Sequence, residues 1–312
     1  MQLVSLGTKV RALIIHNLRA GQRDRREEIG LAASRLTGAG WKVDVVPPAE
    51  GVDADRILRE AVADGLDVAV VAGGDGSLNA AIQALAGRPA ALGVIPTGTG
   101  NVWAKEMGIP LDVRGATEVL LRGCMAVTDL GQANGRYFLS IAGIGFDASV
   151  TRALKPAAKR RLGLMAYVIA AVAEALKLRG EDAILVANGR AVHQRILMVA
   201  ASNTRLYGGI LKMAPEAFVD DGLLDISVFR GRGLRAMARH AIKALLGIHR
   251  GDPEAEFFQT SRLLVESRLD LPVQLDGDYF GTTPMEIRVV PRALRVIVPP
   301  ALHPQFRVMG VG

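Results

Sequence analysis

The stretch DVAVVAGGDGSLNAAIQALAGRPAALGVIPTGTGN, residues 67–101, decides the fold. Two short apolar runs in it, Asp67–Ala72 and Ala91–Pro96, are predicted to be buried strands because neither alternates polar with apolar residues. Each run leads into a glycine-rich turn, GGDG at Gly73–Gly76 and PTGTGN after the second, and a helical pattern follows the first turn over Leu78–Leu85. Strands that alternate with helices in this way predict a parallel sheet with helices on both faces.

The same alternation extends over the N-terminal part of the chain. The predicted elements there are strands at Val10–His16 and Trp41–Val46, helices at Arg23–Gly40 and Asp53–Asp64, and a helix from about Val102. Residues 1–128 are therefore predicted to form an α/β domain. Ligands of such sheets bind at the carboxyl ends of the strands, where both glycine-rich turns lie.

The rest of the chain has a different pattern. Short strands separated by turn residues are predicted at Tyr137–Ile141, Ala183–Ala187, Gln194–Ala201, Leu224–Phe229, Arg262–Ser267, Val273–Asp276, Glu286–Val290 and Ala293–Val298. Two helices, Arg161–Leu178 and about Leu234–Leu246, interrupt them. This pattern is typical of an antiparallel sandwich or barrel, so residues 129–298 are predicted to form a second domain. The tail, 299–312, is expected to pack back on the first.

Composition limits the class of protein and its partners. The chain has 312 residues, 50% hydrophobic and 22% charged, which is typical of a globular protein. Its single cysteine, Cys124, excludes an internal disulfide framework and fits the reducing cytoplasm. The net charge of +7 favours an anionic partner, which could be a nucleotide, a nucleic acid or a membrane surface. Only 4% of residues are aromatic, which argues against a single-strand reader that stacks bases.

Targeting signals and membrane spans are not expected. The N-terminus MQLVSLGTKVRALIIHN has a short apolar run interrupted by Lys9 and Arg11, unlike a signal peptide. The most apolar stretch, Leu162–Leu178, contains Glu174 and Lys177, and its uncharged part is shorter than the roughly 20 residues of a spanning helix. We expect a soluble, cytoplasmic protein that can visit a membrane surface.

The turn GGDGS, Gly73–Ser77, has the composition of an anion site. Glycines let the backbone approach a ligand closely, and amides at a helix N-terminus attract phosphate. Asp75 would repel a bare phosphate, so its presence indicates a magnesium ion, a hydroxyl to be activated or a ribose hydroxyl. The alternative is a tight strand-to-helix turn in which Asp75 or Ser77 caps the helix.

The second turn, Pro96–Asn101, adds hydroxyl and amide groups from Thr97, Thr99 and Asn101. Alone it could be a plain glycine-rich loop. Two such turns on adjacent strands of one sheet favour a phosphate site much more strongly. Neither turn has the spacing of a P-loop or of a dinucleotide-binding fingerprint.

These motifs resemble the diacylglycerol kinase and sphingosine kinase catalytic-domain family, whose usual forms are GGDGT and PxGTxND. SNTRLYGGILKMAPEAFVDDGLLDI (Ser202–Ile226) is similar to the lipid kinases' asparagine, tyrosine, glycine-pair and DDG pattern, and LDGDYF (Leu275–Phe280) to their DGE motif. The resemblance runs from about Val10 to Pro299 and is closest to the bacterial soluble lipid kinases. It implies an α/β nucleotide domain like those of NAD kinases and phosphofructokinases, followed by an antiparallel β-sandwich domain.

The resemblance also implies which residues contact ATP. The implied nucleotide-binding residues are Asn17, Gly21, Gly73, Gly74, Asp75, Gly76, Ser77, Asn79, Gly98, Thr99 and Asn101. Two positions depart from the family pattern. Leu18 replaces a proline, and Pro47 replaces a threonine and so offers no side-chain hydroxyl on the adenine side.

Two further roles follow from the resemblance. Asp278 occupies the place of the family's glutamate, the general base that takes the proton from the lipid hydroxyl. Aspartate is one methylene shorter, so Asp75 or a water is the alternative base, and Asp276–Asp278 could instead be an ordinary hairpin turn. Asp221 carries over as a Mg²⁺ ligand, with the backbone carbonyls of Phe218 and Leu223; here the alternative is a turn before a strand.

The expected function is an ATP- and Mg²⁺-dependent lipid kinase that phosphorylates diacylglycerol or a related lipid. The alternatives are a soluble-substrate kinase of the NAD-kinase type and a non-catalytic homologue that binds nucleotide or lipid.

Basic residues gather in two segments, at 152–161 and 232–250. The second is predicted to be a basic amphipathic helix that docks on anionic lipid headgroups; the alternative is a packed helix with a solvated basic face. The expected partner is therefore a lipid substrate at a membrane surface. No nucleic acid is expected, and a homodimer is compatible with the sequence.

Overall fold

The structure is a computed structural model. The residues that it describes are 10–16, 25–46, 53–154, 164–177, 179–209, 211–300 and 305–306, with side chains between 164 and 169 not described. The chain divides into two compact units. Unit 1 comprises Met1–Leu130, Val219–Asp221 and Pro291–Gly312, and unit 2 comprises Gly131–Phe218 and Gly222–Val290.

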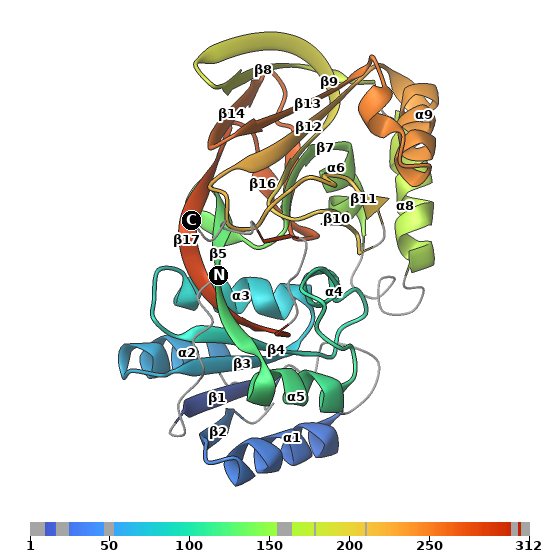
Figure 1. Cartoon of the computed structure of the whole chain (residues 1–312). Helices are drawn as coiled ribbons and strands as arrows, with labels where there is room; N and C mark the ends of the chain where they lie inside the picture. Colours follow the sequence, from blue (N-terminus) through green and yellow to red (C-terminus); the bar gives the residue numbers. More distant parts are fainter. Residues whose placement is uncertain are drawn as a thin grey trace. The chain divides into compact units, whose positions relative to one another are not determined.

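Unit 1 contains the predicted parallel sheet, in the order β17–β4–β3–β1–β2 (Figure 1). The strands are β1 (Arg11–His16), β2 (Lys42–Val46), β3 (Val68–Gly73), β4 (Ala91–Pro96) and the end of β17 (Met285–Val298). Every residue of β3 and β4 is buried. This explains their unbroken apolar runs, because a central parallel strand has helices over both of its faces.

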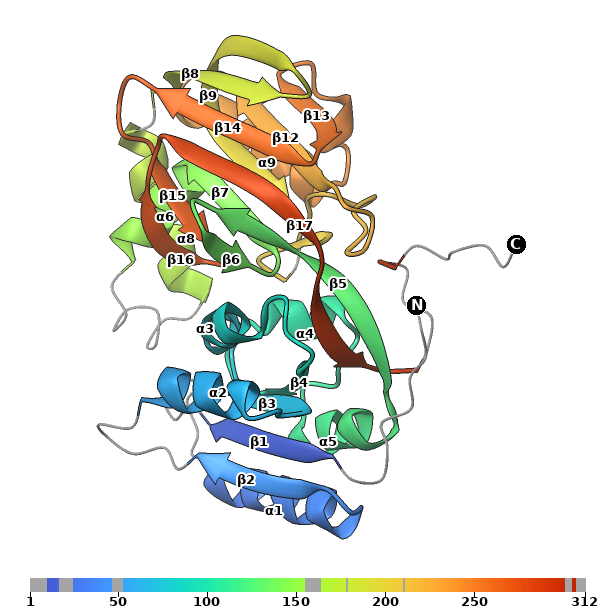
Figure 2. The ribbon, with the colours of Figure 1, turned by 90° about the vertical axis from the view of Figure 1, so that its left-hand side faces the viewer.

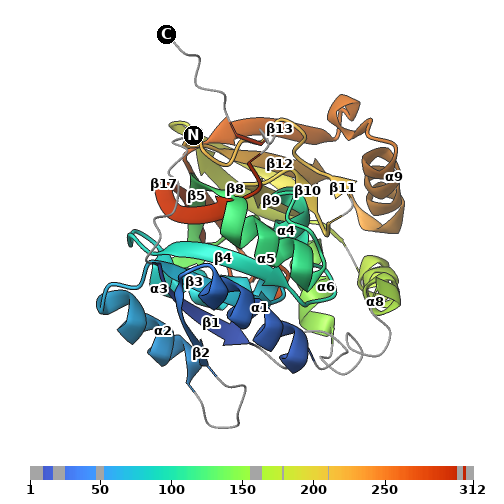
Figure 3. The same cartoon turned by 60° about the horizontal axis from the view of Figure 1, so that its bottom comes forward.

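The helices of unit 1 pack in two pairs. Helix α1 (Arg26–Gly38) lies beside α5 (Val113–Arg122), and α2 (Ala54–Ala63) lies beside α3 (Asp75–Leu85), one pair on each face of the sheet (Figure 3). The side chain of Asp53 accepts a hydrogen bond from the N–H of Arg56 and so caps α2. Asp112 caps α5 in the same way. The short helix α4 (Val102–Glu106) follows the second glycine-rich turn.

Unit 2 is antiparallel, and its main sheet runs β16–β15–β7–β9–β8–β14–β17, with β12 bonded to β9 and β13 (Figure 2). Its strands are β6 (Arg136–Phe138), β7 (Ile141–Gly145), β8 (Glu181–Ala187), β9 (Arg190–Ser202), β10 (Leu206–Tyr207), β11 (Leu211–Lys212), β12 (Leu224–Arg230), β13 (Ala255–Thr260), β14 (Arg262–Ser267), β15 (Pro272–Leu275), β16 (Asp278–Thr282) and parts of β5 (Cys124–Ala133) and β17. Its helices are α6 (Phe146–Ala153), α8 (Leu164–Lys177), α9 (Gly233–Leu245) and a 3-10 turn, His249–Gly251.

The long strand β9 divides the core of unit 2. Val199 and Ala201 face the larger apolar cluster, together with side chains of β14 and β15. Met198 and Ala200 face a second cluster with Phe229. Because successive side chains of a strand point to opposite faces, one strand serves both cores.

Strands β5 and β17 belong to both units. The chain leaves unit 1 along β5 after Leu130 and returns along β17 at Pro291. Within unit 1, the N–H of Arg292 donates to Oδ1 of Asp129 at 2.7 Å, and Val296 pairs with Leu92 of β4. The sequence analysis assigns 129–298 to one domain, whereas this division puts the end of β17 in unit 1. An uninterrupted strand carries no local signal of such a return.

The predicted tail contact concerns residues 299–312, of which the structure describes four. Gln305 donates from its side-chain amide to the carbonyl of Glu106, and Phe306 is buried, both within unit 1. The thiol of Cys124 lies 3.7 Å from the carbonyl of Pro299.

Most predicted elements are confirmed within a few residues, and three predictions are wrong. The strand predicted at Tyr137–Ile141 spans the break between β6 and β7. The two strands predicted at Glu286–Val290 and Ala293–Val298 form the single strand β17. The turn predicted at Gly73–Gly76 already contains the start of α3, at Asp75. Within the described residues, no helix has both the length and the apolar character needed to span a bilayer.

Candidate active site

The first glycine-rich turn delivers the chain from β3 into α3. The N-cap of α3 is Gly74, and no side chain caps this end of the helix, in contrast to α2 and α5. The leading amides of a helix have no partner inside it, so an uncapped N-terminus is suited to an anion. Gly73 must lack a side chain, because a Cβ there would lie 2.5 Å from Cβ of Ser77.

The second turn is closed by Asn101. Its Oδ1 accepts a hydrogen bond from the N–H of Gly98 at 3.0 Å, and its Nδ2 donates to the carbonyl of Gly98 at 2.8 Å. Asn101 has a φ of 49°, in the left-handed region that asparagine tolerates better than most residues. Its side chain therefore shapes the loop, and the neighbouring Thr99 is exposed.

The two turns are in direct contact, as the sequence predicts. The N–H of Thr97 donates to the carbonyl of Gly73 at 3.0 Å. A Cβ on Gly98 would lie 2.5 Å from Cα of Gly74, so neither glycine can be replaced without separating the turns. Asn79, one turn further along α3, is buried. The structure thus brings Gly73–Ser77 and Gly98–Asn101 together at the carboxyl ends of β3 and β4.

Asp75 connects the turns electrostatically. Its Oδ1 accepts a hydrogen bond from the N–H of Trp103, at the start of α4, at 3.1 Å. Its Oδ2 lies beside Gly100, where an added Cβ would be 3.1 Å away. The missing side chain leaves room for a hard cation or its waters beside a carboxylate oxygen, which is the ligand type that Mg²⁺ prefers. The donor set of unit 1 therefore fits a metal-bound polyphosphate.

In unit 2, the DGD segment forms the turn between β15 and β16. Leu275 pairs with Asp278, so Asp276 and Gly277 are the two loop residues, and their φ values are 50° and 86°. Positive φ at both positions is the signature of a type I′ hairpin turn. The carboxylate of Asp276 accepts hydrogen bonds from the N–H groups of Leu139, Ser140 and Ile141, at 2.8, 2.8 and 3.1 Å. Asp278 follows the turn as the first, exposed residue of β16.

Replacing Asp276 by alanine is expected to destabilise unit 2 by about 2–3 kcal/mol, because buried amides lose their acceptor and alanine is strained at positive φ. Asp276→Asn keeps an acceptor and should lose less. Both tryptophans, Trp41 and Trp103, lie in unit 1, so urea unfolding is followed by far-UV circular dichroism. Exposed Asp270→Asn is the matched control, and equal midpoints for Asp276→Ala and this control would contradict the assignment.

A buried carboxyl group holds this turn through hydrogen bonds. Asp147, in the first turn of α6, accepts hydrogen bonds from Nε2 of Gln274 at 3.0 Å, the hydroxyl of Tyr207 at 3.4 Å and the N–H of Ala148 at 2.7 Å. Oε1 of Gln274 in turn accepts from the N–H of Gly277 at 2.7 Å. Asp147 thus positions the turn that precedes Asp278. Burial raises the pKa of Asp147 to about 6, against the effect of its three hydrogen bonds.

This pKa predicts a pH dependence of stability. A carboxyl group whose folded pKa lies above its unfolded value stabilises the fold at low pH, and this stability is lost as pH rises through about 6. Asp147→Asn should remove about 1.4 kcal/mol of the difference in unfolding free energy between pH 5 and pH 8. Urea unfolding of both proteins at the two pH values checks this, and parallel pH profiles would contradict it.

The remaining predicted site residues are the Mg²⁺ ligands implied by the resemblance. Asp221 belongs to unit 1, whereas Phe218 and Leu223 belong to unit 2. Gly222 has a φ of 73°, and β12 begins at Leu224, so the DDG segment is a turn before a strand. In the described part of the chain, no group of three or more His, Cys, Asp or Glu side chains has metal-binding geometry. Asn17, Gly21 and Pro47 lie outside the described residues.

Sequence reasoning missed Asp147, Gln274 and the role of Asp276. The segment GIGFDA, Gly143–Ala148, carries a usable signal, since a strand with two glycines runs into a helix that begins with an aspartate. Gly143 is needed because a Cβ there would collide with Oδ2 of Asp147.

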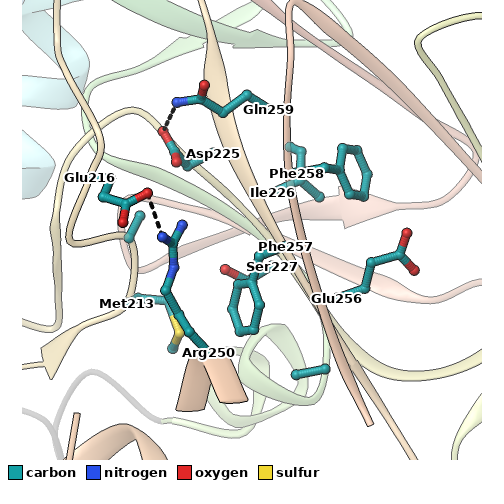
Figure 4. A pocket seen from close by; sticks show the side chains of 12 residues that line it. Met213, Glu216, Asp225, Ile226, Ser227, Arg250, Glu256, Phe257, Phe258 and Gln259 are labelled. Carbon is teal, nitrogen blue, oxygen red and sulfur yellow. Dashed lines mark hydrogen bonds and ion pairs between the residues drawn. The ribbon is translucent and has the colours of Figure 1, made fainter. Parts of the chain in front are cut away.

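A separate pocket of about 660 Å³ lies on unit 2 against β12 and β13 (Figure 4). In this pocket Arg250 pairs with Glu216, and the side-chain amide of Gln259 donates to the carboxylate of Asp225 at 3.3 Å. None of the predicted site residues lines it. It therefore has no place in the candidate active site.

Comparison with known proteins agrees with the fold. The diacylglycerol kinase catalytic domain model matches residues 11–133, and the YegS C-terminal NAD kinase beta sandwich-like domain model matches residues 140–298. The chain is a lipid kinase by class. It belongs to the diacylglycerol kinase family.

Individual relatives span nearly the whole chain. A diacylglycerol kinase of Bacillus subtilis (strain 168) is 30% identical over 93% of this chain and 96% of its own. A "Probable lipid kinase YegS-like" of Shewanella frigidimarina is 32% identical over 90% and 92%. The crystal structure of a diacylglycerol kinase from Bacillus anthracis str. Sterne has a TM-score of 0.73 over 93% of this chain and 97% of that one, at 22% identity, which shows the shared fold.

Proposed function

We propose that this protein transfers the γ-phosphoryl group of ATP to the hydroxyl of diacylglycerol or a closely related lipid, with Mg²⁺. The observation that carries the proposal is the pair of contacting glycine-rich turns with Asp75 between them. Family membership supplies the class of reaction, and the relatives named diacylglycerol kinase supply the acceptor. The single cysteine suits a cytoplasmic protein that acts at the inner membrane surface.

Phosphoryl transfer demands positioning and charge stabilisation more than covalent chemistry from the protein. The amides at the start of α3 and in the second turn bind phosphate oxygens, and the glycines let those oxygens approach the backbone. Mg²⁺, when bound, would neutralise charge on the phosphates. Asp75 would hold it at the nucleotide. Asp221, with the carbonyls of Phe218 and Leu223, would hold a second ion.

The proton of the lipid hydroxyl goes to the carboxylate of Asp278 as oxygen attacks the γ-phosphorus, and ADP leaves. Asp276, Gln274 and Asp147 hold the backbone of the preceding turn, so Asp278 starts from a fixed position. A carboxylate serves as a general base when it lies about 2.6–3.2 Å from the oxygen that it deprotonates.

The test offers ATP labelled at the γ-position, with Mg²⁺, to diacylglycerol, sphingosine, phosphatidylglycerol and NAD in parallel. Label in diacylglycerol, lost on chelation of Mg²⁺, is the expected result. Label in NAD alone would overturn the proposal in favour of a soluble-substrate kinase. Bound ATP with no labelled product would favour a non-catalytic binding protein.

A further inference from the structure

Helix α9 presents its apolar side to solvent. Leu234, Ala238, Ala241 and Leu245 are spaced as one face of a helix, and all four are exposed, Leu245 by 69%. Ile242 is 56% exposed, and the turn after α9 adds Leu246 and Ile248, also exposed. His240 is the buried residue of α9. A surface helix normally buries its leucines, whereas the leucines of this face are exposed to solvent. Such an exposed apolar patch marks a contact site for another molecule.

Three basic side chains of α9, those of Arg239, His240 and Lys243, pair with an acidic residue of unit 2. The carboxylate of Asp252 is fully buried and lies 3.3 Å from Arg239, 3.1 Å from His240 and 3.4 Å from Lys243. Arg239 also pairs with Glu254 at 2.6 Å. Of the predicted basic residues of segment 232–250, these three therefore pair with Asp252, whereas Arg232 and Arg235 are exposed. The charge of the three paired residues is used inside unit 2, and the outer face is apolar.

Helix α8 extends this apolar face. The two helices are in contact, and Figures 1 and 3 both show them side by side. On α8, Val172 and Leu176 lie one turn apart and are 53% and 69% exposed. We call the combined area the α8–α9 surface; it consists of Val172, Leu176, Leu234, Ala238, Ala241, Ile242, Leu245, Leu246 and Ile248.

Cations without acidic partners stand at one end of this surface. A Cβ on Gly180 would lie 2.6 Å from the carbonyl of Gly231, so the end of α8 meets the start of α9 there. Arg179, Arg232 and Arg235 are exposed at this junction, and none forms an ion pair within the described residues. No acidic residue occurs from Ile226 to Gly251, and Glu174 of α8 pairs with Lys177.

This combination distinguishes between two occupants. In a symmetric contact between two copies, the arginines at one end of the α8–α9 surface would lie over the other end of the partner's surface. The α9 segment there has no acidic residue from Ile226 to Gly251 that could pair with them. An anionic bilayer accepts both features, because its headgroups attract arginine and its acyl region accepts leucine and isoleucine.

We propose that the α8–α9 surface docks on anionic lipid bilayers, with its leucines and isoleucines inserted at the headgroup boundary and the three arginines among the headgroups. The docking rests on the proposed function, since it would bring a lipid kinase to its acceptor. The apolar contacts hold the protein on the bilayer, and the arginines give it a preference for anionic over neutral lipid. The basic residues bound to Asp252 take no part.

Sedimentation with phosphatidylglycerol–phosphatidylcholine vesicles tests the docking. Leu245→Asp should reduce the bound fraction at least about tenfold, because a charge then replaces an inserted leucine. The matched control is Leu31→Asp, the same change at a leucine of α1 that is 61% exposed, and it should bind like the wild type. Arg235→Gln should weaken binding to these vesicles and leave the residual binding to pure phosphatidylcholine unchanged. Equal thermal midpoints confirm folding.

Two further measurements decide the remaining outcomes. If Leu245→Asp binds vesicles like the wild type and instead converts a dimer to a monomer in light scattering, a second copy covers the surface and the proposal is overturned. Phosphorylation of a detergent-dispersed short-chain diacylglycerol by the wild type reports the proposed function without vesicles. Activity there without vesicle binding overturns the docking alone, whereas vesicle binding without activity overturns the proposed function alone.

Discussion

Replacing Asp278 by asparagine is expected to lower kcat about 10³-fold, because an amide cannot accept the proton of the acceptor hydroxyl. The turn before Asp278 is held by the carboxylate of Asp276, by Gln274 and by the N–H of Asp276, which donates to the carbonyl of Ile141 at 2.9 Å. The backbone therefore has little freedom to compensate for the shorter side chain. Asp278 is exposed, so the substitution should leave the thermal midpoint unchanged.

Asp278→Glu restores the family's side-chain length and should keep or raise kcat. The matched control for the asparagine variant is Asp270→Asn, which removes an exposed carboxylate of the same unit just before β15. Initial rates with saturating ATP and diacylglycerol provide the comparison. If Asp278→Asn retains wild-type kcat, the base lies elsewhere, and Asp75 becomes the next residue to test in that role.

Asp75→Asn is expected to lower kcat roughly 10²–10³-fold at nearly unchanged stability, on the scale of other losses of preorganised charge. Asparagine keeps an oxygen to accept from the N–H of Trp103, so α4 stays in place. The variant loses the negative charge and the second carboxylate oxygen, which lies beside Gly100 at the place that suits a hard cation. Kinetics measured over a range of Mg²⁺ concentrations should show the loss.

Alanine at position 75 separates the two tasks of the carboxylate. It should lose activity like asparagine and in addition destabilise unit 1 by about 1 kcal/mol, because the N–H of Trp103 loses its acceptor. Fluorescence of the buried Trp103 reports this directly. Asp44→Asn, at an exposed position on β2, is the control. Wild-type kcat for Asp75→Asn would remove Asp75 from the catalytic machinery.

The α/β half of the fold is predictable because its signals are local. Strands β3 and β4 are unbroken apolar runs, each is followed by glycines, and their helices carry caps or periodic faces. The contact between Gly74 and Gly98 follows from placing the two turns on adjacent strands. The sandwich half is predicted less well: β13, which pairs with β12 about 30 residues earlier, is not among the predicted strands, and the strand predicted at Tyr137–Ile141 spans the break between β6 and β7.

Two features of unit 2 could not be predicted from the sequence, for different reasons. The hydrogen bonds from Asp147 through Gln274 to Gly277 join residues more than a hundred positions apart in the sequence. Nothing near Gln274 in the sequence marks it as a partner of a buried carboxyl group. On α9 the amphipathic periodicity is correct, but three of the basic residues, Arg239, His240 and Lys243, pair with buried Asp252, and leucines on another face are exposed. An amphipathic pattern indicates that a helix has two unlike faces, and the partner, here buried Asp252, determines which one turns inward.

The return of β17 bears on how the protein is made. Arg295 and Val296 pair with Ala91 and Leu92 at the border of the sheet of unit 1, yet they are translated only after the strands of unit 2. A nascent chain that ends before Pro291 leaves β4 with a bare edge. Strands β1–β4 leave the ribosome first, but the half of the protein that carries the glycine-rich turns can be completed only after the sandwich has been synthesised. In folding during synthesis, the last strand of the unit 1 sheet is therefore added only after unit 2 has been made.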